Sequence, residues 1–134
     1  MTVARVQVDD VIAAADFRAA LRRFLRRSER VARRSGLTPQ RYLLLLMIKG
    51  APGGAEQSTV TELAGRLQLA QSTVTELVSR AEEAGLVERE ASQTDARVAH
   101  LRLTPEGERR LLLSFTQLET ERAQLRDAVA AFTD

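Results

Sequence analysis

The chain has 134 residues, of which 44% are hydrophobic, and 20 Lys and Arg residues stand against 18 Asp and Glu residues. This length favours one domain spanning residues 1–134 with a sizeable core. The absence of cysteine and the presence of one histidine exclude thiolate chemistry and a histidine metal cluster, and we expect no catalytic residues, metal or cofactor. No apolar stretch approaches the roughly 20 residues that cross a bilayer, so we expect a cytoplasmic protein without membrane contact.

Positive charge is concentrated near the N-terminus. Residues 1–50 carry a net charge of +7, whereas residues 51–104 carry −3 and residues 105–134 carry −2. Arginine accounts for 19 of the 20 basic residues, and its planar guanidinium suits carboxylates or phosphates. A pI near 9.9 is compatible with binding to double-stranded DNA. The aromatic content of 4% disfavours the stacking platforms of single-strand binders.

Residues 10–35 show the periodicity of one long amphipathic helix. Phe17, Leu21 and Phe24 lie on one face, and the eight arginines of residues 18–34 lie on the other. Three interpretations fit this arginine stripe: a membrane-surface helix, a clamp on the DNA backbone, or a solvated face that meets acidic side chains. We prefer the last. The acids concerned are Glu106, Glu108, Glu119 and Glu121.

A second helix is expected over residues 40–49. Thr38 followed by Pro39 supplies an N-cap and then a proline at the first helical position. Residues 42–48 are apolar on all sides, which is typical of a helix buried at the centre of a domain. A loop rich in glycine and proline at residues 50–54 ends this helix.

The sequence Ser-Thr-Val-Thr-Glu-Leu occurs twice, at residues 58–63 and 72–77. In the first copy Thr59 and Glu62 form a capping-box pattern, which opens a short helix. The second copy opens another helix after a turn of three residues, 68–70. A short helix, a tight turn and a second helix with polar side chains outside are typical of a helix-turn-helix that reads DNA.

Polar side chains on the second of these helices are the candidate DNA contacts. For the serine and threonine residues, helix capping is the alternative, and we favour contact. For Arg80, contact with phosphate and an ion pair with Glu76 are equally good interpretations. Together with Thr59 on the preceding helix, the candidates are Gln71, Ser72, Thr73, Thr75, Glu76, Ser79 and Arg80.

A β-hairpin, the wing, is expected from residues 86–90 and 98–103, where apolar residues alternate with polar ones. Asp95 and Arg97 lie at its tip. Arg97 can enter a narrow minor groove while Asp95 braces the loop, and a surface pair between the two residues is the alternative. We prefer the DNA contact.

One helix is expected over residues 105–132, because Thr104 and Pro105 repeat the signal of a cap followed by proline. Apolar residues recur along it at heptad spacing, interrupted by Arg122. Such a seam needs a partner helix, either the N-terminal helix of the same subunit or that of a second subunit. The residues expected in this contact are Phe17, Leu21, Phe24, Leu111, Phe115, Leu118, Leu125, Val129 and Phe132.

Five short motifs, in their order and spacing, resemble the MarR (multiple-antibiotic-resistance regulator) family of winged-helix transcription factors. The first motif opens the helix expected over residues 40–49, and the second opens the helix that follows the turn at residues 68–70. The third motif enters the wing, the fourth lies at its tip and the fifth leaves it. They are residues 37–42, 71–75, 85–89, 95–97 and 103–107. Each is weak alone, and their combination is fairly specific.

The resemblance implies a mainly α fold with a small β-hairpin wing. A winged helix-turn-helix lobe over residues 38–104 would lie between long dimerisation helices at residues 10–35 and 105–132. The chain departs from the family in its single expected C-terminal helix, where typical members have two. A homodimer that represses transcription from a pseudo-palindromic operator in double-stranded DNA is expected.

The resemblance also implies a small-molecule effector pocket between the dimerisation helices and the lobe, as in many members. Phe17, Phe24 and Tyr42 are candidates for its lining, and ordinary core packing is the alternative. A winged-helix interaction module or antirepressor without DNA binding stays open, because Glu76 and a net negative lobe disfavour contact with DNA. An enzyme is the least favoured class.

Overall fold

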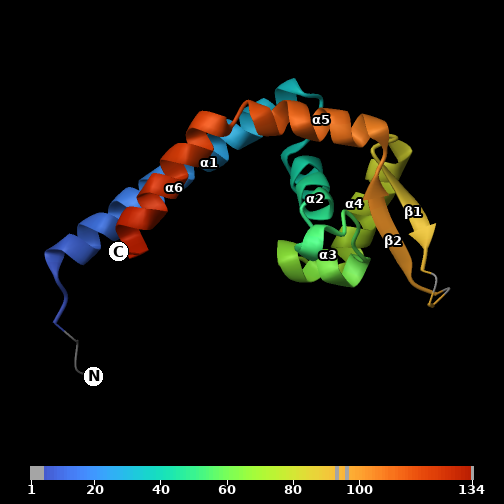
Figure 1. Ribbon diagram of the computed structural model, residues 1–134, viewed down its shortest axis with the longest axis horizontal. Helices are drawn as coiled ribbons and strands as arrows, with labels where there is room; N and C mark the ends of the chain where they lie inside the picture. Colours follow the sequence, from blue (N-terminus) through green and yellow to red (C-terminus); the bar gives the residue numbers. More distant parts are fainter. Residues whose placement is uncertain (1–4, 93, 96, 134) are drawn as a thin grey trace.

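The computed structural model describes residues 5–92, 94–95 and 97–133. Figure 1 shows a lobe attached to one end of a long two-helix arm. The elements in chain order are α1 (Val8–Arg34), α2 (Pro39–Lys49), a short 3-10 turn η1 (Pro52–Gly54), α3 (Val60–Leu67), α4 (Gln71–Glu83), β1 (Val87–Ala91), β2 (Ala99–Leu103), α5 (Pro105–Thr116) and α6 (Glu119–Thr133). The predicted fold class, mainly α with a β-hairpin, is confirmed.

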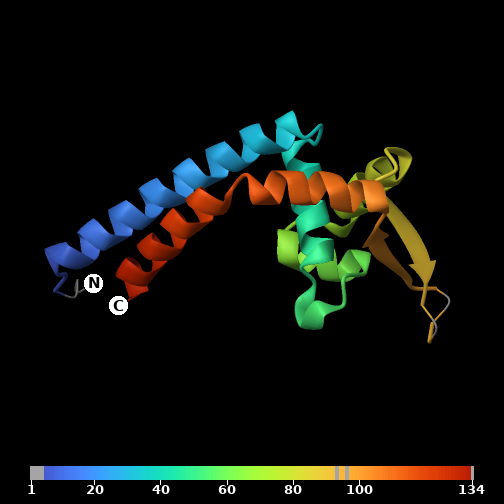
Figure 2. The same ribbon diagram turned by 45° about the horizontal axis from the view of Figure 1, so that its top comes forward.

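The arm consists of α1 and α6, which run antiparallel side by side (Figure 2). The rings of Phe17 and Phe132 stack with their centroids 5.1 Å apart. Nearer the lobe, Arg27 Nε lies 3.3 Å from Glu121 Oε1. Of the fifteen described residues of α6, none is buried, so this arm carries little core of its own.

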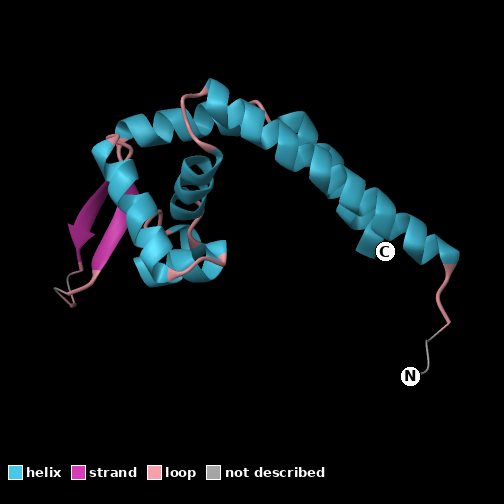
Figure 3. Ribbon diagram, turned by 180° about the vertical axis from the view of Figure 1, so that it is seen from behind, coloured by secondary structure: helices cyan, strands magenta, loops and turns pink. Residues whose placement is uncertain are grey.

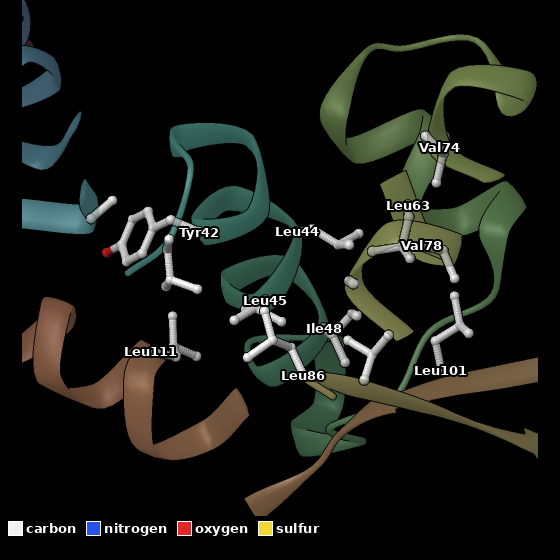
Figure 4. Packing of buried hydrophobic residues seen from close by; sticks show 14 of the residues in the cluster. Tyr42, Leu44, Leu45, Ile48, Leu63, Val74, Val78, Leu86, Leu101 and Leu111 are labelled. Atoms are coloured by element: carbon white, nitrogen blue, oxygen red, sulfur yellow. The ribbon is translucent and has the colours of Figure 1, made fainter. Parts of the chain in front are cut away.

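Helix α2 passes through the centre of the lobe, as its apolar sequence predicts. Thr38 is the N-cap and accepts a hydrogen bond from the backbone N–H of Arg41 at 3.1 Å. The side chains of Leu44, Leu45 and Ile48 are completely buried. Figure 4 shows them among residues from α3, α4, α5 and the hairpin. This helix therefore forms the centre of the hydrophobic core against which the helix-turn-helix and the wing pack.

The predicted helix-turn-helix is formed by α3 and α4. The capping box is present, since Thr59 Oγ1 accepts from Glu62 N and Glu62 Oε1 accepts from Thr59 N. Gln68 ends α3 in the left-handed conformation, with φ of 57°. Helix α4 buries Val74 and Val78 against the core, because these apolar side chains recur at helical spacing on one face.

The wing is an antiparallel hairpin in which Val87 pairs with Leu103 and Ala91 with Ala99. It stands at the end of the lobe opposite the arm (Figure 3). Ser58, just before α3, forms an isolated bridge to Leu101 through hydrogen bonds of 3.1 and 2.8 Å. The bridge ties the start of the helix-turn-helix to the wing.

The prediction of one helix over residues 105–132 is wrong. Helix α5 ends at Thr116, and α6 begins at Glu119. Side chains take up the carbonyl groups at the break: Thr116 Oγ1 donates to the carbonyl of Leu112, and the Arg122 guanidinium donates to that of Phe115. Such local side-chain bonds compete with the helical ladder, so the chain turns here and follows α1 as a separate helix.

The break also places two seam residues inside the lobe. Leu111 is 1% exposed and Leu118 is completely buried, and both belong to the same core as α2. The residues of the heptad pattern therefore lie in two different environments, since α5 packs on the lobe while α6 packs on α1. Leu111 and Leu118 are therefore not available to a second subunit, because they are already buried within one chain, in a core that also includes Val31 and Ala32 of α1.

Candidate DNA-binding site

The outer face of α4 presents every polar residue that the sequence singled out on this helix. The residues are Gln71, Ser72, Thr73, Thr75, Glu76, Ser79 and Arg80, and all are exposed. Opposite them, Val74, Val78 and Ala81 are completely buried. The helix is thus anchored along one side and offers a polar surface on the other.

The N-terminus of α4 is uncapped within the described part of the chain. Its N-cap is Ala70, which has no side-chain hydrogen bond to the first turn. The capping interpretation therefore fails for Ser72 and Thr73, whereas it holds for Thr59 at the start of α3. Unpaired N–H groups at a helix start, together with the helix dipole, favour an anion such as a phosphate.

Glu76 and Arg80 form an ion pair on this outer face. Arg80 Nη2 lies 2.6 Å from Glu76 Oε1, and both side chains are about two-thirds exposed, at 63% and 64%. This is the pairing that the sequence left as one of two alternatives for Arg80. The pair borders a hollow of about 110 Å³ that Gln40, Thr73 and Leu77 complete.

The tip of the wing holds the second predicted cation. Asp95 Oδ1 accepts hydrogen bonds from the backbone N–H of Arg97 at 3.0 Å and from its Nε at 3.3 Å. Ser92 Oγ in turn accepts from the backbone N–H of Asp95 at 3.3 Å. The Arg97 side chain is nevertheless 92% exposed. Asp95 therefore orients this side chain through Nε, while the rest of the guanidinium extends into solvent.

Two further arginines of the lobe, both on the hairpin, are paired with acids. Arg89 lies 2.8 Å from Glu82, and Arg102 lies 3.0 Å from Glu90. These strand arginines are therefore ordinary surface charges.

Lys49, at the end of α2, contacts two acids. Its Nζ lies 2.7 Å from Glu56 and 2.5 Å from Glu108 on α5. The hydrogen bonds to Glu108 and then to Glu56 raise the pKa of Lys49. The same contact lowers the pKa of Glu56. This cluster joins the loop before α3 to α5.

The predicted pairing of the α1 arginine stripe with C-terminal acids holds at one of the four acids, Glu121. Glu108 binds Lys49 instead, and Glu106 binds Arg109 and Arg110 of its own helix at 2.7 and 2.8 Å. Those two arginines, Arg109 first, lower the pKa of Glu106 to about 2. No described ion pair includes Glu119. The stripe is therefore mostly solvated within one chain.

The effector-pocket candidates are not brought together. Tyr42 lines a small hollow of about 60 Å³ between α1 and α2, where Leu25, Ser28 and Leu43 are among its neighbours. Phe17 instead stacks on Phe132 in the arm. Burial raises the pKa of Tyr42. Sequence reasoning missed Ser28, whose only signal was a small polar residue on the inner side of a helix.

Two other site classes find no support in the described residues. No described helix has the length and hydrophobicity of a membrane span. The same part of the chain contains no group of three or more potential metal ligands.

A sequence model described as the MarR family matches residues 35–98. Among curated proteins, none matches this chain. Several solved structures are similar over most of the chain. A MarR family transcription regulator named SP03579 is 25% identical, with a TM-score of 0.70, covering 87% of this chain and 75% of its own.

Two further structures share the fold. AbsC, a MarR family transcriptional regulator from Streptomyces coelicolor, is 21% identical with a TM-score of 0.67, covering 94% of this chain and 82% of its own. A cysteine-to-serine mutant of MarR from E. coli, complexed with operator DNA, is 20% identical with a TM-score of 0.70, covering 87% and 84%.

Proposed function

The chain belongs to the MarR family of DNA-binding transcription regulators, and we propose that it is a homodimeric repressor of a pseudo-palindromic operator. The lobe over residues 38–104 binds DNA, and the arm forms the dimer. The observation that carries this proposal is α4, an uncapped helix that is buried on one side and polar along the other. A helix of this kind can place its first turns in a major groove.

DNA contact follows from the arrangement of three features on the lobe. The open N-terminus of α4 meets a phosphate, its polar side chains meet base edges, and Arg97 at the wing tip meets the adjacent minor groove. The candidate contacts are Thr59, Gln71, Ser72, Thr73, Thr75, Glu76, Ser79, Arg80, Asp95 and Arg97. The E. coli MarR structure with operator DNA supports this reading by analogy of fold.

The arm supports a dimer because it leaves apolar surface uncovered. Val129 and Phe132 on α6 are 38% and 46% exposed, and Val11 and Ile12 on α1 are 56% and 52% exposed. Apolar side chains gathered in this way mark an interaction surface. A second copy covers it symmetrically, since a two-fold interface uses the same patch on both subunits.

Leu111 and Leu118 are left out of the proposed dimer interface, because both are buried within one chain. Phe17, Leu21, Phe24, Phe115, Leu125, Val129 and Phe132 remain proposed contributors. A two-fold dimer then presents two α4 helices to successive major grooves about 34 Å apart. A small-molecule effector that releases the DNA is the remaining element of this proposal, and the hollow beside Tyr42 is its candidate position.

The proposal is tested by enriching random-sequence duplex DNA on the purified protein at physiological salt. An inverted repeat with half-sites one helical turn apart is expected, with affinity that falls steeply as salt rises. Enrichment of no inverted repeat would contradict the proposal. The second candidate function is a protein-interaction module, which the net charge of −3 over residues 51–104 motivates. Binding to a partner protein without any binding to duplex DNA would favour it.

The wing contact is tested by Arg97→Ala, measured on the enriched operator. Loss of a minor-groove guanidinium should weaken binding by about 1–3 kcal/mol. Arg89→Ala is the matched control, because Arg89 lies on the same hairpin and pairs with Glu82. An unchanged Kd for Arg97→Ala would remove the wing from the mechanism.

A further inference from the structure

The position of Glu76 on α4 is unusual for a surface that meets DNA. Residues spaced by four, three and four share one side of a helix, and here that line runs opposite the buried Val74 and Val78. It contains Ser72, Glu76, Ser79 and Glu83. An acid therefore occupies the middle of the outer face, where phosphates on both sides of a major groove repel it.

The ion pair with Arg80 removes this repulsion. With 2.6 Å between Arg80 Nη2 and Glu76 Oε1, the two side chains enter a groove as a unit of zero net charge. The carboxylate accepts hydrogen bonds and donates none, whereas the guanidinium donates several. The unit therefore presents an acceptor directly beside donors.

Base edges in the major groove complement this unit to different degrees. The amino groups of cytosine N4 and adenine N6 are the donors that a carboxylate can reach there. In a G·C pair, the cytosine amino group lies beside two neighbouring acceptors, guanine O6 and N7, which bind arginine bidentately. An A·T pair separates its acceptors on either side of the adenine amino group, so a fork-shaped guanidinium finds one at a time.

We infer that Glu76 and Arg80 together read one G·C pair in each half-site. Glu76 accepts from cytosine N4, and Arg80 donates to guanine O6 and N7 of the same pair. The inference rests on the proposed DNA-binding function and names the base pair that this surface selects. Under it, the acidic residue is a determinant of specificity, and the ion pair orients both side chains before DNA arrives.

The experiment compares sequences enriched by the wild type, Glu76→Gln, Glu76→Ala and Glu83→Gln. The wild type should select a G·C pair at one symmetric position of its repeat by about tenfold over A·T. Glu76→Gln should shift that position toward A·T, because glutamine binds adenine N6 and N7. Glu76→Ala should weaken the preference there. Glu83→Gln, which removes the same charge from the last residue of α4, should keep it.

A chemical probe isolates the proposed hydrogen bond. Replacing that cytosine by 2-pyrimidinone removes its N4 amino group, and wild-type affinity should fall while that of Glu76→Ala stays constant. Identical base preferences in the wild type and both Glu76 variants would overturn the inference while leaving the proposed function intact. Failure of the wild type to enrich any repeat would instead overturn the proposed function, and the inference with it.

Discussion

The contact between Gly107 and Leu86 provides a sharp test of how the wing is held on the lobe. Gly107 lies in the first turn of α5, and a Cβ atom there would lie 2.0 Å from the carbonyl oxygen of Leu86. That oxygen also accepts a hydrogen bond from the backbone N–H of Thr104 at 3.0 Å. Because the obstacle is backbone, a change of rotamer cannot relieve it.

Gly107→Ala must therefore push α5 away from the end of the hairpin by about 1.4 Å to reach ordinary van der Waals contact. Overpacking of this kind costs about 1–3 kcal/mol, and loss of the Thr104 hydrogen bond adds about 1 kcal/mol. The better helix propensity of alanine offsets about 1 kcal/mol. We expect a net loss of about 2 kcal/mol in the free energy of unfolding.

Gly65→Ala is the matched control. Gly65 is exposed within α3. Apart from its chain neighbours and the backbone of its own helix, no described atom lies within 4 Å of a Cβ added there. The same substitution should here stabilise the protein by about 0.5–1 kcal/mol. Urea unfolding at one fixed protein concentration, because a dimer is proposed, should give opposite signs for the two variants. A Gly107→Ala variant at least as stable as the wild type would refute the packing argument.

Two further predictions concern acid stability and assembly. Glu106→Gln should lower the urea midpoint at pH 6 and by much less at pH 2. A folded-state pKa of about 2 means that the carboxylate stabilises the fold fully above its ordinary pKa and loses most of this effect as the pH falls to 2. An equal difference at both pH values would contradict this origin. Val129→Asp should dissociate the dimer in light scattering while the chain stays folded, since Val129 is 38% exposed in one chain and the charge would be buried in the interface. Thr120→Asp, on the opposite side of α6, should leave the dimer intact, and a dimeric Val129→Asp variant would move the interface elsewhere.

Local signals in the sequence determined where most elements begin. Thr38 with Pro39, Thr59 with Glu62, and Thr104 each predict a helix start, and all three threonines cap helices in the structure. These signals work because the capping side chain binds a backbone N–H only three residues further along the chain. The apolar period of α4 likewise predicts its polar outer face, since one buried stripe specifies the opposite side.

Tertiary structure decided which side chains distant in the sequence come into contact. The heptad pattern near the C-terminus could not reveal that Leu118 is buried within one chain, because the same spacing is found in residues that face a second subunit and in residues that face the core. The ion pair of Lys49 with Glu108 joins residues 59 positions apart, beyond the reach of any local pattern. The need for glycine at position 107 arises from the backbone of Leu86. Such contacts depend on how elements pack in space, and no periodicity in the chain encodes that choice.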